Sequence, residues 1–212
     1  MIEGLKKAHR WVASRRILLS AAGLFWLAAV LGGTLFLARY SNSAGQAGEP
    51  PDRWPESSNV PHNAARPTLV MFVHPHCPCS RASVGELALL MARCHDRLEA
   101  HVFFLRPARM PLEWAQTDLW REAARIPGVV VHRDDDGREA RCFAASTSGA
   151  TALYDLSGQL LFHGGITAAR GHSGDNAGRA AIQSLVLEQS VGRSCTPVFG
   201  CSLFDCSAKG AP

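Results

Sequence analysis

Hydrophobic residues along this chain form one long run and then a series of short ones. Residues 17–38 read ILLSAAGLFWLAAVLGGTLFLA, without a charged side chain. A helix of this length rises about 30 Å, enough to span a bilayer, and it exceeds the apolar region of about 7–15 residues found in signal peptides. The pattern therefore predicts a transmembrane helix over residues 17–38. A signal peptide cleaved near Ser43 is the alternative.

Shorter patterns follow from residue 68 onward. The apolar run at 68–73 lies between two prolines and predicts a strand buried on both faces. Apolar residues at helical spacing then predict an amphipathic helix over about 79–97. Ser83 and Glu86 fit a capping box, which would move the helix start three residues later. The remaining pattern predicts strands at 101–105, 129–132, 150–155 and 159–163, with helices at about 117–125, 139–145 and 177–189.

This order of elements predicts an α/β domain. Three strands alternate with helices, and a hairpin around a Gly-containing turn and a last helix follow. Such a series forms a four- to five-stranded sheet with helices on both faces. We expect five parts along the chain: a basic N-terminus at 1–16, the transmembrane helix at 17–38, a Pro- and Gly-containing linker at 39–67, the folded domain at 68–190, and a cysteine-containing tail at 191–212.

The charge distribution predicts how the chain is oriented. The net charge is +4, but six basic residues and one acidic residue before position 40 contribute +5, so the rest of the chain is close to −1. Basic residues preceding an apolar helix place the N-terminus in the cytoplasm and the domain outside. Because the excess positive charge belongs to the N-terminus, no nucleic-acid partner is expected.

Candidate chemistry centres on Cys77 and Cys79. The chain contains seven cysteines, so at least one cannot pair with another of the same chain. Cys77 lies where a strand meets a helix, and a helix N-terminus lowers the pKa of a thiol. We expect its sulfur to be ionisable and accessible to a partner. His74 and His76 are candidates to hold a proton or support a thiolate, unless they are simply exposed turn residues.

The segment Phe72-Val73-His74-Pro75-His76-Cys77-Pro78-Cys79 resembles the active-site turn of the thioredoxin superfamily, especially of its membrane-anchored members. The resemblance implies a thioredoxin-like fold and disulfide oxidoreductase activity on a protein dithiol or disulfide. It makes Cys77 the attacking cysteine and Cys79 the resolving one. It also implies a single-pass protein of the bacterial inner membrane with a periplasmic domain.

Two departures from the superfamily pattern are visible. Only Pro78 separates the two cysteines, where the superfamily usually has two residues, so a bond between them would be strained and easily reduced. The superfamily also has a cis-proline opposite the active-site turn, near residues 149–151 here, and no proline is present. The missing proline weakens the oxidoreductase interpretation and favours the alternative of metal capture.

A Gly-rich loop at 164–176 is too dense in polar groups for an ordinary connector. Together with Thr147-Ser148-Gly149 and the HPHCPC segment, it resembles the bacterial membrane-anchored thioredoxin-like proteins called RedB. We hypothesise that Arg170 and His172 border Cys77, where a guanidinium would stabilise a thiolate. The alternative is that both residues only cap the last helix.

Two other functions compete with the oxidoreductase. Cys77, Cys79 and His76 offer ligands suited to Cu(I), as in thioredoxin-like copper chaperones. A binding module that kept the fold without catalysis is the third possibility. Consecutive acidic residues at 134–136 indicate a turn and helix cap rather than a calcium loop, which needs spaced ligands.

The other cysteines divide by context. Cys94 lies on the apolar stripe of the predicted first helix of the domain, which favours a buried, inert thiol. Cys142 receives no role. Cys195, Cys201 and Cys206 crowd the tail, where a structural disulfide is the favoured interpretation and an auxiliary redox pair the alternative.

Overall fold

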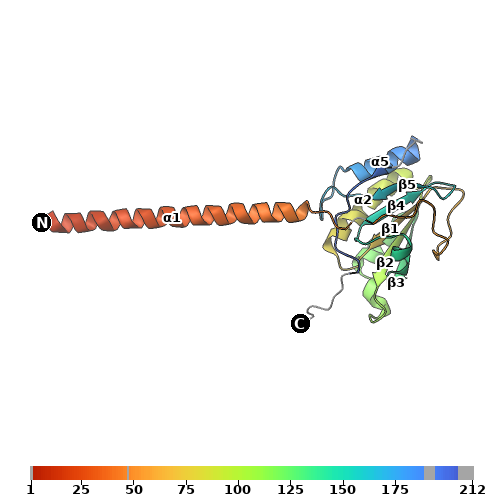
Figure 1. Ribbon diagram of the computed structural model, residues 1–212, viewed down its shortest axis with the longest axis horizontal. Helices are drawn as coiled ribbons and strands as arrows, with labels where there is room; N and C mark the ends of the chain where they lie inside the picture. The colour runs from red at the N-terminus through yellow and green to blue at the C-terminus, as the bar shows by residue number, and fades with distance from the viewer. Residues whose placement is uncertain (1, 47, 189–193, 205–212) are drawn as a thin grey trace. The chain divides into compact units, whose positions relative to one another are not determined.

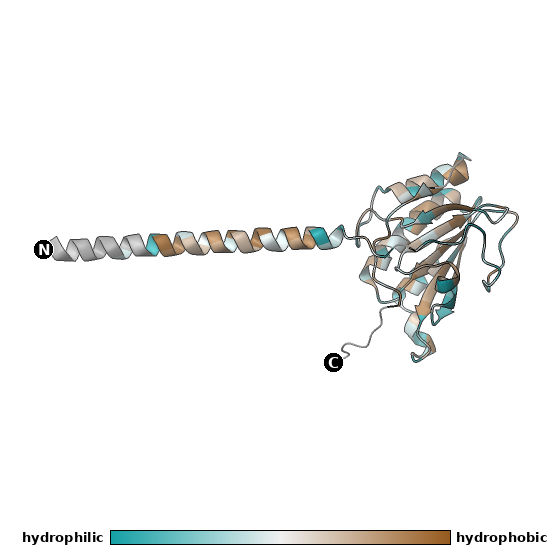
Figure 2. Ribbon diagram, viewed as in Figure 1, coloured by the Kyte–Doolittle hydropathy of each residue, from teal (hydrophilic) through white to brown (hydrophobic). Residues whose placement is uncertain are grey.

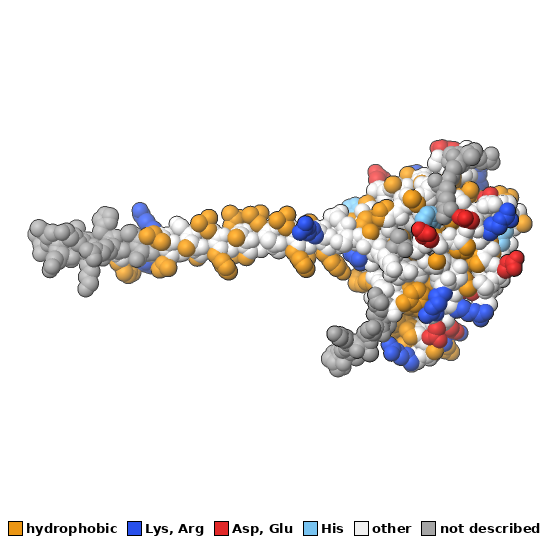
Figure 3. Space-filling view, in the orientation of Figure 1, with side chains coloured by type: hydrophobic (Ala, Val, Ile, Leu, Met, Phe, Trp, Pro, Cys, Tyr) orange, Lys and Arg blue, Asp and Glu red, His pale blue; other side chains and the backbone are white. Residues whose placement is uncertain are grey.

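The chain divides into two units, Met1–Ser41 and Asn42–Pro212. The computed structural model describes residues 2–46, 48–188 and 194–204. The first unit is one helix, α1 (Ile2–Ser41), of which Arg15–Ser41 is long and apolar enough to cross a membrane. None of that stretch is buried within the chain. Figures 2 and 3 show hydrophobic residues along it, so α1 is compatible with a single-pass anchor.

A six-stranded mixed sheet forms the second unit (Figure 1). The strand order is β3-β2-β1-β4-β5-β6, in which β2 and β3 run parallel to β1, and β4 runs antiparallel to it. The strands are β1 (Thr68–Val73), β2 (Glu99–Arg106), β3 (Val129–Asp135), β4 (Ala150–Tyr154), β5 (Leu160–Gly164) and β6 (Ser194–Cys195). The helices are α2 (Pro78–Cys94), η1 (Leu112–Ala115), α3 (Asp118–Ala124), α4 (Arg138–Cys142) and α5 (Ala177–Leu187).

One face of the sheet is covered by α2, α3 and α5. Because side chains alternate along a strand, Leu69, Met71 and Val73 of β1 all point to this face, where they pack against Leu87 of α2 and Ile182 of α5. All six residues of β1 are buried, as the uninterrupted apolar run predicted. The turn that follows β1 therefore starts from a strand at the centre of the core.

The opposite face is covered largely without helices. Val70 and Phe72 of β1 pack in a cluster with Phe143, next to α4, and with Val60 from the predicted linker. Trp54 meets Phe143 edge-on at a ring-centroid distance of 5.1 Å. The sequence indicated a tether over 39–67 and helices on both faces. The structure instead lays part of that segment on the sheet, because α4 has only five residues and leaves apolar surface to cover.

The structure differs from the sequence-based expectation at the start of α2. Ser83 and Glu86 were interpreted as a possible capping box, but the helix begins at Pro78 and both residues lie inside it, fully buried. Cys77 is the N-cap residue, and Pro78 occupies the first helical position, where its missing N–H costs no hydrogen bond. Further differences include the unpredicted 3-10 helix η1, the longer strand β3, the short strand β6 and the course of the tail.

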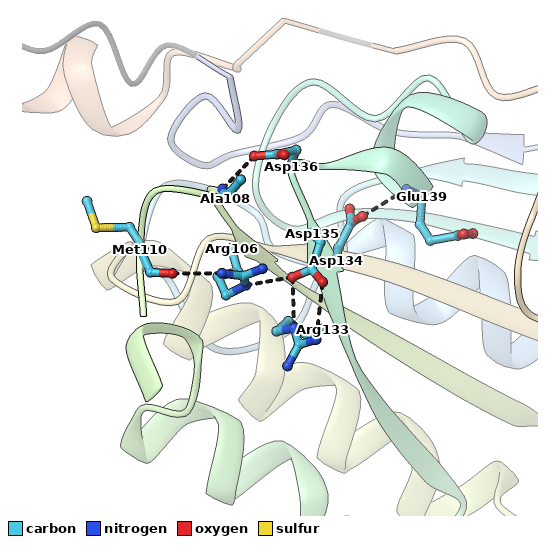
Figure 4. A network of polar contacts seen from close by, with 8 residues as sticks. All are labelled: Arg106, Ala108, Met110, Arg133, Asp134, Asp135, Asp136 and Glu139. Atoms are coloured by element: carbon cyan, nitrogen blue, oxygen red, sulfur yellow. Dashed lines mark hydrogen bonds and ion pairs between the residues drawn. The ribbon is translucent and has the colours of Figure 1, made fainter. Parts of the chain in front are cut away.

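The acidic segment 134–136 caps α4, as predicted, although Asp134 and Asp135 belong to β3 rather than to a turn (Figure 4). Asp134 accepts hydrogen bonds from the backbone N–H groups of Glu139, at 2.8 Å, and Ala140, at 3.0 Å, at the start of α4. Asp135 binds Arg106 and Arg133 instead. Burial raises the pKa of Asp134 to about 6. These carboxylates are therefore used within the fold.

Candidate active site

Cys77 stands at the junction of β1 and α2. Its extended backbone, with φ −85° and ψ 118°, closes the turn, in which the Cys77 N–H donates to His74 O at 3.1 Å. Only 4% of Cys77 is exposed. The predicted position at a helix start is therefore found, but the expected accessibility is not. The reason is a contact that the sequence did not reveal.

That contact is with Cys201 of the tail. The two Sγ atoms lie 2.9 Å apart, within hydrogen-bond range. Burial raises the pKa of the Cys77 thiol, but hydrogen bonds from Cys201 and Ser80, through side chains and backbone, outweigh burial and bring that pKa below its usual value. Burial and the neighbouring Cys77 raise the pKa of Cys201 to about 12. Cys77 is thus the more acidic thiol of the pair, and Cys201 beside it is the less acidic one.

Ser148 connects the turn, the helix and the tail. Its hydroxyl accepts from the His74 N–H at 2.8 Å and shares a hydrogen bond with the Ser80 hydroxyl at 2.6 Å. Its backbone N–H donates to Cys201 O at 2.8 Å. Ser148 lies directly before residues 149–151, where the superfamily's cis-proline was sought, and no described peptide bond is cis. One residue here fixes both sulfur-bearing segments.

Cys79 and Arg170 lie on the same side of the site. Burial, and then Cys77, raise the pKa of the Cys79 thiol, while Arg170 acts in the opposite direction. Arg170 donates to the backbone oxygens of Gly200 and, at 3.0 Å, Ser43. Arg170 therefore lies beside Cys79 and also holds the tail, and its hypothesised action on the Cys77 thiolate stays a prediction.

The three histidines of the sequence-based hypothesis are placed differently. His76 Nε2 is 3.1 Å from the backbone oxygen of Trp114, and the His74 and His76 rings contact the Trp114 ring at centroid distances of 5.5 and 4.6 Å. Burial, and then His76, lower the pKa of His74, so its ring is neutral at pH 7. His172 is exposed, in a turn where its N–H donates to Ala169 O. The rings of His74 and His76 thus both pack against the ring of Trp114, beside the turn.

Metal binding finds limited geometric support. In residues 2–46, 48–188 and 194–204, no group of three or more His, Cys, Asp or Glu side chains is arranged to hold an ion. Of the ligands named for copper, Cys77 and Cys79 are near each other, while His76 is turned to Trp114. Cu(I) accepts two sulfur ligands, so the cysteines alone fit its chemistry.

The other cysteines lie elsewhere. Cys94 is 1% exposed within the core, as predicted, and burial raises the pKa of its thiol. Cys142 lies near Ser57, whose hydroxyl is 3.4 Å from its sulfur. Cys195 is exposed on β6 and, like Cys201, is a free thiol, so the favoured interpretation of a disulfide between them is wrong. The reason is that β6 pairs with β5, whereas Cys201 reaches the turn. Cys206 lies outside the described residues.

Four residues of this site were not predicted: Ser80, Trp114, Ser148 and Cys201. The available signals for Cys201 were the odd number of cysteines and the crowding of three of them in the tail. Ser148 was noted only as part of a resemblance. For Trp114 and Ser80, nothing in the local pattern distinguished them from ordinary helix residues.

The architecture around Cys77 defines the fold class. A central strand with one parallel and one antiparallel neighbour leads into a helix whose N-cap is a cysteine. This arrangement, with β3 beyond β2 and a hairpin partner β5 beyond β4, is thioredoxin-like. The protein therefore has a thioredoxin-like fold preceded by one apolar helix.

Known proteins were compared with this chain. No protein-family model matches it, and no curated protein does. Among solved structures, it is similar to a hypothetical protein, SMc02350, from Sinorhizobium meliloti, with a TM-score of 0.58, 19% identity, and coverage of 79% of this chain and 99% of the other. It is also similar to an uncharacterised conserved protein from Geobacillus kaustophilus, with a TM-score of 0.57 and 17% identity. That match covers 79% of this chain and 95% of the other.

A weaker likeness joins the chain to a secreted Mycobacterium tuberculosis disulfide oxidoreductase described as homologous to Escherichia coli DsbE. The TM-score is 0.43 and the identity 13%, covering 60% of this chain and 84% of the other. At the identities of the first two structures, the similarity extends to the fold alone. The chemistry of this chain is therefore argued from its own cysteines.

Proposed function

We propose that this protein is a membrane-anchored thiol–disulfide oxidoreductase that acts outside the cytoplasm, with the Cys77 thiolate as its attacking group. The observation that carries the proposal is the position of Cys77 at the N-cap of α2, 2.9 Å from a second sulfur. A helix N-terminus and hydrogen-bond donors favour the anionic sulfur, which is the reactive form. A paired sulfur provides the second half of a two-electron couple.

The membrane anchor and the location outside the cytoplasm belong to the same proposal. Support comes from the apolar stretch of α1 and from the basic residues that precede it. Reactive cysteine pairs suit compartments where protein disulfides form and persist. We place the domain in the periplasm of a bacterium, among the RedB-like proteins that its HPHCPC segment and Gly-rich loop resemble. The partner is a protein dithiol or disulfide.

The test uses the full chain in detergent micelles. We expect the wild-type protein to accelerate disulfide exchange with insulin or with a small dithiol, and Cys77→Ser to fall to the uncatalysed rate. Cys195→Ser is the matched control, because Cys195 is an exposed thiol away from the site. Equal rates for wild type and Cys77→Ser would refute the proposal.

Cu(I) binding is measured on the same samples, by competition with a chromogenic chelator. Metal uptake that depends on Cys77, together with no exchange activity, would replace the oxidoreductase by a copper-binding protein. If the folded protein showed neither disulfide exchange nor Cu(I) binding, only the binding module would remain.

A further inference from the structure

The tail is docked beside Cys77 by a regular set of backbone contacts. Residues 147 and 202 form an antiparallel bridge, and the Leu203 N–H donates to Ser146 O at 2.9 Å. With the bond from Ser148 N–H to Cys201 O, this makes a short antiparallel ladder directly before β4. Such pairing fixes the direction of successive side chains. It therefore sets where the Cys201 sulfur points.

Two further contacts fix the approach of the tail. Arg170 binds the backbone oxygen of Gly200, and a Cβ atom at Gly200 would stand 1.9 Å from Ser148 O. Only glycine permits so close an approach of the two backbones. Contacts of Gly200 before Cys201, and of residues 202 and 203 after it, thus hold the Cys201 sulfur in place.

We propose that Cys201 is the resolving cysteine and that the redox couple of this protein is Cys77 with Cys201. The inference rests on the proposed oxidoreductase function and identifies the second sulfur of the same site. The two Sγ atoms need to approach by only about 1 Å from their present 2.9 Å to reach bonding distance. They are separated by 124 residues in the sequence, but the folded chain has already brought them together.

Cys79 is poorly arranged for that role. It is the second residue of α2, and although its thiol also hydrogen-bonds with that of Cys77, only Pro78 separates the two residues. A Cys77–Cys79 bond would close a small ring over Pro78, whose φ is fixed by its own side chain. Forming it would distort the first turn of α2. Cys201 approaches from another segment and requires no such change.

The cycle balances with a partner disulfide as oxidant. The Cys77 thiolate attacks one partner sulfur, the partner S–S bond breaks, and the other partner sulfur leaves and takes up a proton. Cys201 then loses its proton and attacks Cys77 Sγ, which forms the Cys77–Cys201 bond and releases the second partner sulfur as a thiol. Two electrons pass to the partner, and its two sulfurs take up one proton from Cys201 and one from solvent. The reverse sequence oxidises a partner dithiol.

Electrostatics support this order of events. Besides burial, two of the causes that raise the pKa of Cys201 are its hydrogen bond with Cys77 and the charge of Cys77. Both disappear once Cys77 is bonded to the partner, because that sulfur is then neutral. Arg170 remains beside Cys201 and favours its anion. The resolving sulfur is thus easier to ionise only after the first step.

The experiment follows the mixed disulfide in the full chain in detergent. Reduced protein is mixed with oxidised glutathione, quenched with acid at intervals, and mapped by fragmentation mass spectrometry. In Cys201→Ser we expect the glutathione adduct at Cys77 to persist at least about 10-fold longer than in wild type. Cys201→Ala repeats the test with a different replacement. Cys79→Ser should lengthen the lifetime far less, and Cys195→Ser is the matched control.

Mapping of the oxidised wild type supplies the second readout, which we expect to be a Cys77–Cys201 disulfide. A Cys77–Cys79 disulfide, or an adduct that persists in Cys79→Ser and resolves normally in Cys201→Ser, would overturn the assignment while leaving the oxidoreductase standing. Wild-type protein that forms no adduct at Cys77 and exchanges no disulfide would instead remove the proposed function itself.

Discussion

Hydrogen bonds to one sulfur decide the chemistry of single residues in this site. Cys77 receives them from Cys201 and from Ser80, and Ser80 is itself fixed by Ser148. The anion is therefore stabilised by neutral donors as well as by the start of α2. Arg170 instead acts on Cys79 and Cys201, where its charge lowers the pKa of the thiol against the effect of burial.

The reactivity of Cys77 should consequently depend on Cys201. A thiol becomes nucleophilic as pH rises through its pKa, so a lowered pKa keeps Cys77 reactive at pH values where an ordinary thiol is not. We expect iodoacetamide labelling of Cys77, measured by mass spectrometry in a Cys79→Ser background, to have its midpoint below that of free cysteine. Adding Cys201→Ser should move the midpoint upward, and an unchanged midpoint would show that Cys201 does not support the anion.

The sequence predicted the role of individual residues only where the signal was local. Cys77 could be placed at a helix start because a buried strand ends four residues before it. Cys201 could not, since its partner is 124 residues away and no periodicity marks the tail. His74 and His76 were near the cysteines in sequence, but Trp114, which comes from η1, determines the direction of their rings.

Between elements, one buried carboxylate ties α2 to the Gly-rich loop. Glu86 accepts from Gly174 N–H at 2.7 Å, from Asn176 at 3.0 Å and from Arg179 at 2.6 Å, and its side chain is 1% exposed. The loop that carries Arg170 thus begins at β5 and is fixed at its far end to the helix of Cys77. This contact was not foreseen, because the sequence does not show which loop a helix residue will face.

Removing Glu86 should destabilise the protein strongly. Glu86→Ala leaves the Arg179 guanidinium without its buried partner, and we expect a loss of about 3 kcal/mol in the free energy of unfolding, measured by urea denaturation. Arg81→Ala is the control, because the Arg81 pair with Asp118 is exposed to solvent and should contribute much less to stability. Similar losses in both variants would contradict this account of the loop.

Docking of the tail should depend on Gly200. In Gly200→Ala the added methyl group would overlap Ser148 O, so the ladder must open and carry Cys201 away from Cys77. We expect the Cys77–Cys201 disulfide to form at least about 10-fold more slowly than in wild type, by the same mass-spectrometric mapping. Gly85→Ala, on α2 with open space around it, should form the bond at the wild-type rate. Unchanged kinetics in Gly200→Ala would mean that the tail can adapt.

The regular elements were well predicted because their patterns are physical requirements of burial. The apolar run of β1 and the helical spacing of α2 gave nearly correct bounds, and the Gly-containing turn gave the β4–β5 hairpin. The cover around Trp54 and Val60 has no period, since an irregular segment contacts the sheet at isolated points. Sequence patterns therefore predicted the sheet and missed both irregular segments that lie on it.

At the scale of the whole molecule, α1 should retain the protein in the membrane. Leu27 and Leu31 are exposed on its apolar stretch, and an Asp at the centre of a spanning helix costs roughly 3 kcal/mol. We expect wild type to resist alkaline carbonate extraction and the Leu27→Asp, Leu31→Asp double variant to be extracted, with Leu27→Val, Leu31→Val as control.

The side of the membrane on which the domain lies is tested separately. Protease added to spheroplasts should digest the domain, whereas protection from the protease would place the domain in the cytoplasm.

The distance along the chain between the two paired sulfurs also affects biosynthesis. Cys77 is synthesised 124 residues before Cys201, so the nucleophile of the proposed couple emerges well before its proposed resolving partner. For that interval, Cys201 cannot resolve an adduct formed at Cys77. Assembly of the proposed couple therefore waits for the segment around Cys201, and a chain interrupted before that point would carry Cys77 without this partner.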